Sequence, residues 1–128
     1  MSMRLLTINE TGLLRELLRR AGLLDIHEGQ LGGLIVEDMD DGGMGSIRLH
    51  RPDVLIECAQ MDKKASELQF LDADGVLVIA SLNLNIEGFP FEIDIWKVNS
   101  EPLQFIPEQG KFTDVEYTVI PDKGNGLE

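Results

Sequence analysis

The sequence predicts an α+β domain in which one N-terminal amphipathic helix packs on a mainly antiparallel sheet of about five strands. Three observations support this prediction. Leucines repeat at helical spacing over residues 8–21, apolar and polar residues alternate over residues 67–70, 76–84 and 89–98, and turn-forming segments rich in glycine, aspartate and asparagine separate the strands. Because strands joined by short turns pair antiparallel, residues 67–98 are expected to form a three-stranded meander.

The length of 128 residues suits one hydrophobic core, so residues 1–126 are expected to form a single domain. Leu127 and Glu128 follow a Gly-Asn-Gly tripeptide and have the form of residues left by cloning. No apolar run approaches the roughly 20 residues of a membrane-spanning helix, and the N-terminus lacks the pattern of a signal peptide. These features predict a cytoplasmic protein that makes no membrane contact.

The N-terminal helix has both a start signal and a stop signal. Thr7 and Glu10 have the spacing of a capping box, in which each side chain binds the backbone N–H of the other residue. Gly22 is a natural C-terminal stop, because glycine adopts the left-handed conformation that often ends helices. We therefore expect a helix from about residue 8 to 21, with these leucines on its buried face: Leu13, Leu14, Leu17 and Leu18.

The first half of the sheet is expected to be a short hairpin. Residues 23–33 are expected to be a connection with one short turn, and the β-branched segment 34–38 a strand. Aspartates and glycines at 40–46 favour a reversal of the chain, and 47–49 would return as the second strand. A proline follows, and the course of residues 52–62 stays open between a short strand and a helical turn.

The second half begins with a hairpin turn at 72–75 and continues through a further turn at 85–88. Residues 89–98 are the strongest single strand. Three prolines follow residue 100, and residues 114–120 are expected to form an edge strand at most, because proline cannot donate to a sheet ladder.

Alternation along these strands predicts a polar outer face. If the apolar set that begins at Phe91 faces the helix, Asp94 and Trp96 must face the other way. Tryptophan is enriched at binding hot spots, so this face is the leading candidate for partner contact. Its candidate partner-binding residues are Glu67, Gln69, Asn83, Glu92, Asp94 and Trp96. In the alternative interpretation, the C-terminal segment covers this face and buries Trp96 with Leu77 and Ile79.

The formal charge is −12 and is unevenly distributed along the chain. Residues 1–20 contain four arginines and two glutamates, whereas the remaining residues contain seven basic and 21 acidic side chains. A field of this sign repels nucleic acid and anionic membranes and accelerates association with basic proteins. The charge therefore predicts a basic protein partner. In the alternative interpretation, it only keeps the protein soluble.

The acidic loop from Glu37 to Ser46 is the only segment that suggests a metal site. Clustered carboxylates suit calcium and magnesium, but the spacing does not match an EF-hand loop. The histidines, His27 and His50, lack the spacing of a zinc site, and no motif supplies an activated nucleophile or a phosphate-binding loop. We expect no catalytic residues and no cofactor. The only candidate metal ligands are Asp38, Asp40 and Asp41.

Three segments together resemble a family of small bacterial proteins catalogued as a domain of unknown function. They are Met3-Arg4-Leu5-Leu6-Thr7-x-x-Glu10 with its leucine helix, the Glu-Asp-Met-Asp-Asp-Gly-Gly-Met-Gly-Ser run at 37–46, and Glu-Ile-Asp-Ile-Trp-Lys-Val at 92–98. The resemblance covers roughly residues 3–104. It implies a link to immunity proteins of bacterial toxin systems and provides no catalytic residues.

These observations favour a non-enzymatic, acidic protein-binding module, and specifically an immunity protein that neutralises a basic bacterial toxin. A first alternative is a divalent-metal-dependent enzyme or ligand binder that uses the loop at 37–46. A second alternative is a homodimeric structural protein that associates through the outer sheet face.

Overall fold

The computed structural model describes residues 3–52 and 60–116. It confirms an α+β domain with an antiparallel sheet. The expected counts of about five strands and one helix are wrong, because the described residues form six strands, two α-helices and two 3-10 helices. The elements in chain order are β1 (Met3–Leu5), α1 (Ile8–Arg20), α2 (Leu24–His27), η1 (Glu28–Gly33), β2 (Ile35–Asp38), β3 (Ile47–His50), β4 (Met61–Leu71), β5 (Leu77–Asn85), β6 (Pro90–Lys97) and η2 (Gln109–Lys111).

The missed elements are too short to show a periodic pattern. Strand β1 has three residues and α2 has four, which is about one helical turn. Helix η1 adds six residues where a connection with one turn was expected. Residues 53–59, which belong to the segment whose course the sequence left open, lie outside the described residues.

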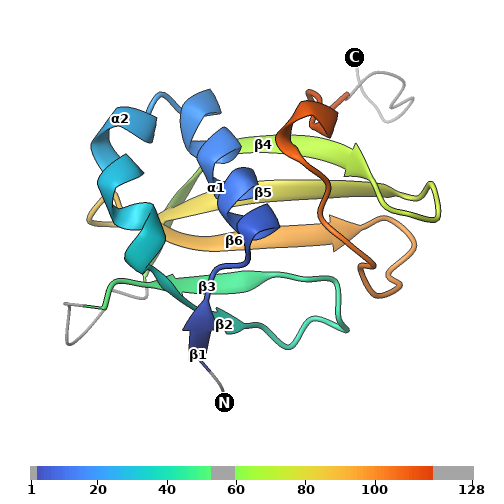
Figure 1. Ribbon diagram of the computed structural model, residues 1–128, viewed down its shortest axis with the longest axis horizontal. Helices are drawn as coiled ribbons and strands as arrows, with labels where there is room; N and C mark the ends of the chain where they lie inside the picture. The colour runs from blue at the N-terminus through green and yellow to red at the C-terminus, as the bar shows by residue number, and fades with distance from the viewer. Residues whose placement is uncertain (1–2, 53–59, 117–128) are drawn as a thin grey trace.

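The sheet has the strand order β1-β2-β3-β6-β5-β4, and every neighbouring pair is antiparallel. The predicted meander of β4, β5 and β6 is therefore confirmed. Helices α1 and α2 lie on one side of the sheet (Figure 1). We call the opposite side of the sheet the outer face.

Helix α1 begins and ends where the sequence predicts. The Thr7 hydroxyl accepts a hydrogen bond from the Glu10 N–H (3.1 Å), and the Glu10 carboxylate accepts one from the Thr7 N–H (2.9 Å), which confirms the capping box. Gly22 follows the helix with φ of 74°, and the Leu23 N–H reaches back to the carbonyl of Leu18 (2.8 Å). The four predicted leucines are fully buried against the sheet.

The first strands are joined by the predicted turn. Asp41 accepts hydrogen bonds from the backbone N–H groups of Met44 (3.0 Å) and Ser46 (2.9 Å), which closes the turn between β2 and β3. Gly45 has φ of 100°, and an added Cβ there would lie 2.9 Å from a methyl carbon of Leu103. Glycine is required at this position both for its backbone conformation and for the close approach of the C-terminal segment.

Strand β6 alternates as predicted, with one irregularity. Ile93 and Ile95 belong to the main core, whereas Asp94 and Trp96 are exposed. The register with β5 shifts between Asn83 and Leu84, so Phe91 has no directly opposite residue. Phe91 is buried, but it lies outside the main core cluster.

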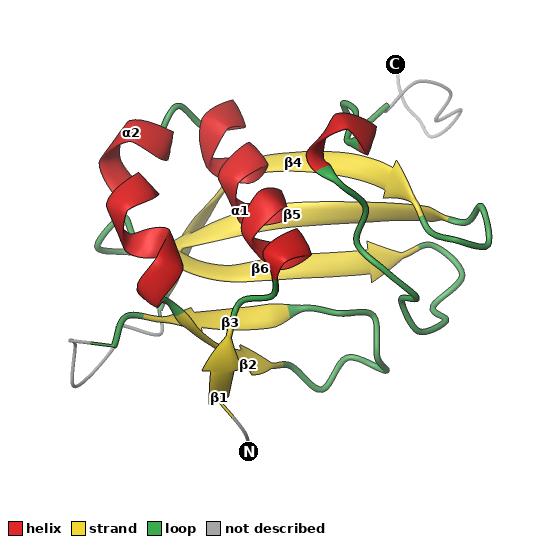
Figure 2. Cartoon of the chain, in the orientation of Figure 1, coloured by secondary structure: helices red, strands yellow, loops and turns green. Residues whose placement is uncertain are grey.

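The C-terminal segment runs along the same side of the sheet as α1, as Figures 1 and 2 show. Its Ile106 carbonyl accepts a hydrogen bond from the Asn9 side chain (2.7 Å), and Asp114 forms an ion pair with Arg20 of α1. Thr113 then forms a single bridge with Gln69 at the outer edge of β4. Up to residue 116, therefore, the C-terminal segment covers the helix side and leaves Trp96 exposed.

Candidate functional site

The register of the meander brings the predicted partner-binding residues together on the outer face. Trp96 lies opposite Ile79, which lies opposite Gln69. One row further along the strands, Asp94, Ser81 and Glu67 are opposite one another in the same way. The six residues therefore occupy three adjacent rows on β4, β5 and β6, the third of which contains Asn83 and Glu92.

One end of the outer face is apolar. Leu71 lies opposite Leu77, and the N–H of Val98 binds the carbonyl of Leu77 (3.0 Å). Trp96 is 48% exposed and Leu71 is 59% exposed. We call this set the apolar stripe; its members are Leu71, Leu77, Ile79, Trp96 and Val98.

The acidic row borders the apolar stripe. Asp94 is exposed, and its nearest protein donor is the Ser46 hydroxyl at 3.4 Å. That hydroxyl also accepts the Ile95 N–H at 2.8 Å, so Ser46 is mainly used to join β3 to β6. Glu67 binds the Lys64 ammonium at 2.7 Å and is less exposed. Asp94 is therefore the acid of this row that most directly faces solvent.

The third row is internally neutralised. The Glu92 carboxylate accepts hydrogen bonds from Arg48 and from the Asn83 amide, each at 3.2 Å. Next to this pair, His50 lies 3.2 Å from Glu37. Glu92 is paired within the sheet and Asn83 is buried. These two residues therefore hold neighbouring strands together and offer few free polar groups to a partner.

Sequence reasoning missed Leu71 and Val98 as parts of this surface. Both continue the outward alternation, from Gln69 and Trp96 respectively, by two positions. That extension was the available signal, but Leu71 is the last residue of β4 and Val98 follows the last residue of β6, where alternation alone does not determine which way a side chain points.

A buried ion cluster lies beneath the same end of the sheet. Lys97 is fully buried, and its ammonium group lies 2.8 Å from Asp72 and 2.7 Å from Asp74 of the β4–β5 turn. It also donates to the Pro102 carbonyl at 3.3 Å. Asp72 in turn accepts the backbone N–H of Gln104 at 2.9 Å. We call this cluster the Lys97 clamp, because it ties the C-terminal segment to the sheet.

Each member of the clamp is stabilised in its charged form. Burial by itself would raise the pKa of Asp72, but hydrogen bonds from Lys97 and from the N–H groups of Gln104, Ala73 and Phe105 lower that pKa below its ordinary value. Hydrogen bonds to the two aspartates raise the pKa of Lys97. The sequence predicted only a hairpin turn at this position, and gave no sign that the turn also binds a buried lysine.

The three candidate metal ligands do not converge on one point: two of them bind other groups of the protein, and the third faces solvent. Asp38 binds Arg4 at 2.7 Å, and this hydrogen bond lowers the pKa of Asp38. Asp41 closes its own turn, as described above, and Asp40 is exposed. Within residues 3–52 and 60–116, no three histidine, cysteine, aspartate or glutamate side chains are grouped as a metal site.

A family model described as "Domain of unknown function (DUF6984)" matches residues 3–107. The chain belongs to the DUF6984 family. Comparisons with curated proteins and with solved structures find no match. The DUF6984 region extends three residues beyond the end expected from the resemblance, and it contains the outer face and all members of the Lys97 clamp. Among the described helices of this DUF6984 protein, none is long and apolar enough to span a membrane.

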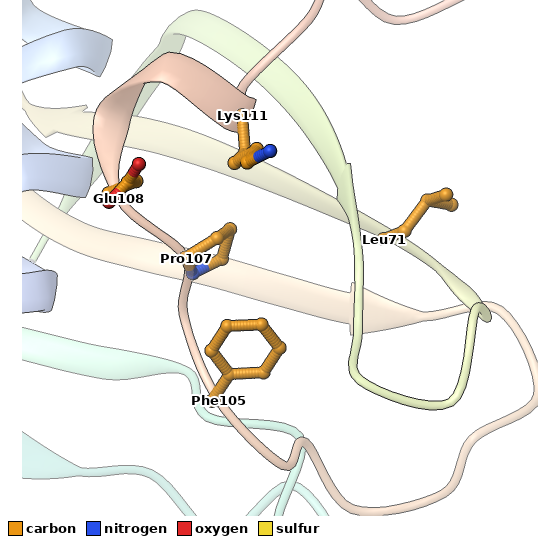
Figure 3. A pocket seen from close by; sticks show the side chains of 5 residues that line it. All are labelled: Leu71, Phe105, Pro107, Glu108 and Lys111. Carbon is orange, nitrogen blue, oxygen red and sulfur yellow. The ribbon is translucent and has the colours of Figure 1, made fainter.

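A pocket of about 450 Å³ lies where the C-terminal segment passes the end of β4. Figure 3 shows Phe105 and Pro107 on one side of this space and Leu71 on the other, with Glu108 and Lys111 toward η2. We call it the tail pocket. Its three apolar residues lie inside the DUF6984 region, whereas the two charged residues follow it.

Proposed function

We propose that this protein is a non-enzymatic binding module that presents its outer face to a basic protein. The observation that carries the proposal is the exposure of Trp96, 48%, beside the exposed Asp94 on a face that no described element covers. Exposing the indole to water does not stabilise the folded protein, whereas a tryptophan at the centre of an interface contributes strongly to affinity.

The charge of the protein favours a basic partner. The formal charge is −12, and Asp94 and Glu67 border the apolar stripe on the side away from the β4–β5 turn. Acidic groups around an apolar centre increase the association rate of a basic protein and oppose binding of acidic ones.

The finer proposal is that the basic partner is a bacterial toxin and that this protein is its cytoplasmic immunity protein. It is supported by the small size, the acidity and the sequence resemblance described above. An immunity protein needs tight binding and no chemistry, which agrees with a surface that places an acidic row beside an apolar stripe.

Pull-down from the native host followed by mass spectrometry would identify the partner. The purified pair would then be titrated between about 50 and about 500 mM NaCl, where screening of exposed charges increases. We expect the affinity to fall as salt rises. An affinity independent of salt, or no protein partner, would refute the proposal.

Trp96 provides a direct readout, because it is the only tryptophan. With 5-fluorotryptophan incorporated, a single fluorine NMR signal should shift when the partner binds. Trp96→Ala should weaken binding about 30-fold, and Asp94→Asn about tenfold. The matched control is Asp25→Asn, which removes the same charge from an exposed position on α2. If Asp25→Asn weakens binding as much as Asp94→Asn, only net charge matters and the outer face is not the interface.

A homodimer through the apolar stripe is the second candidate. The exposed apolar area favours it, but two copies of charge −12 repel each other. Sedimentation at increasing protein concentration separates the two candidates: a dimer whose formation buries Trp96 would replace the basic partner as the occupant of this face.

A further inference from the structure

The tail pocket extends the apolar stripe around the edge of the sheet. Leu71 belongs to both, since it lines the pocket with Phe105 and lies opposite Leu77 in the stripe. Phe105 is 45% exposed and Leu71 is 59% exposed, so both present apolar surface to solvent. A partner that covers the stripe would therefore reach the pocket without leaving apolar surface.

The position of the pocket walls is fixed by hydrogen bonds to the rest of the fold. The N–H of Phe105 donates to Asp72 at 3.2 Å, and Asp72 is held by Lys97. Pro107 is buried next to Ile106, whose carbonyl is bound by Asn9 of α1. The pocket is therefore formed before any partner binds, and a side chain entering it need not order the walls.

The segment that supplies most of the pocket lining is acidic. Residues 101–116, which supply four of the five lining residues, contain four acidic side chains and one lysine. Of these charged residues only Glu108 and Lys111 line the pocket, and Asp114 is paired with Arg20, so the preference for a basic segment comes from the net charge of the whole protein, −12. An apolar pocket on a protein of this charge is complementary to an apolar side chain with basic neighbours. A second copy of this acidic protein is a poor match on the same grounds.

We propose that the tail pocket receives an apolar side chain of the basic partner, presented from a segment in which lysine or arginine flanks that side chain. The inference rests on the proposed function for the basic character of the partner. It adds a second contact region, located on the helix side of the sheet, and states the chemistry of the partner segment.

The test uses two capped tripeptides of equal charge, acetyl-Lys-Leu-Lys-amide and acetyl-Lys-Ser-Lys-amide, titrated into the isotopically labelled full chain. We expect the leucine peptide to shift the backbone amide signals of Leu71, Phe105 and Lys111, and to bind at least about fivefold more tightly than the serine peptide. Equal binding of the two peptides would overturn the proposal, because charge alone would then explain it.

Two pocket variants separate shape from charge. Phe105→Glu and Phe105→Lys both replace an apolar wall of the pocket with a polar side chain but change the charge in opposite directions. The proposal predicts that both weaken leucine-peptide binding at least fivefold. If Phe105→Glu strengthens binding while Phe105→Lys weakens it, the contact is electrostatic and the proposal fails. Leu71→Glu and Leu71→Lys repeat the comparison at a more exposed residue if either Phe105 variant does not fold.

Other occupants give different results. If the leucine peptide binds only after residues 117–128 are deleted, the chain's own C-terminus is the occupant and the proposal is wrong. If the pocket signals shift with protein concentration alone, a second copy is the occupant and the proposal is again wrong. A negative peptide result leaves the Trp96 fluorine signal and the Asp94→Asn effect unaltered, so the two proposals can fail separately.

Discussion

The ammonium group of Lys97 lies 2.8 Å from a carboxylate oxygen of Asp72, and neither side chain has any solvent exposure. This pair joins the end of β6 to the β4–β5 turn. Because Asp72 also accepts the N–H groups of Gln104 and Phe105, the same carboxylate fixes the C-terminal segment over the helix side of the sheet.

Replacing Lys97 by methionine should destabilise the fold strongly. The substitution leaves the buried Asp72 carboxylate without its counter-charge, and breaking a buried ion pair from one side is costly. We expect the melting temperature to fall by about 10 °C. Lys111→Met is the control at an exposed lysine and should change it little. In the double variant with Asp72→Asn, the loss should be smaller than the sum of the single losses; simple additivity would show that the two groups are not coupled.

The clamp should also make stability sensitive to acid. The pKa of Asp72 is lowered in the folded protein, so its contribution is fully present above its ordinary value of 3.8 and is lost as the pH falls through the folded value. Urea unfolding measured from pH 6 to pH 2 should therefore show a decrease below about pH 4. In Asp72→Asn, which should be less stable than the unaltered protein at pH 6, this decrease should be shallower. An unchanged slope would mean that other carboxylates dominate the acid transition.

His27 should produce a separate transition at milder pH. Burial lowers the pKa of His27, and a hydrogen bond with Gln30 offsets this only in part. The ring lies against that of Phe89 in a tilted contact, with centroids 5.3 Å apart and an angle of 56° between the two planes. Its stabilising contribution is present above its ordinary value of 6.5 and is lost as the pH falls below it. His27→Leu should remove the decrease in unfolding free energy between about pH 6.5 and pH 5. His50→Gln is the control and should retain the His27 contribution.

The glycines of the β2–β3 turn offer a matched comparison of backbone strain with steric contact. Gly42 has φ of 78° with open space around it, whereas Gly45 has φ of 100° and lies against Leu103. Gly42→Ala should cost about 1 kcal/mol for the left-handed backbone alone. Gly45→Ala should cost a further 1–3 kcal/mol, roughly, for overpacking. Equal costs in chemical denaturation would show that Leu103 moves away freely.

Local sequence signals predicted local structure well. The capping box at Thr7, the stop at Gly22 and the leucine spacing each depend on contacts within a few residues, so they are readable without the fold. The same holds for the alternation that sends Asp94 and Trp96 to one face. In contrast, β1 contains too few residues for any pattern, and it forms a strand because β2 lies beside it.

The sequence alone determined an acidic α+β chain with a capped leucine helix, an antiparallel meander and a face that contains Trp96. Only the tertiary structure decided that β3 lies beside β6, that the C-terminal segment up to residue 116 follows the helix side, and that Lys97 is buried between two aspartates. Alternation directs Lys97 inward, but a lysine there is stable only if distant carboxylates meet it. That pairing depends on how the β4–β5 turn approaches the end of β6, which no local pattern specifies.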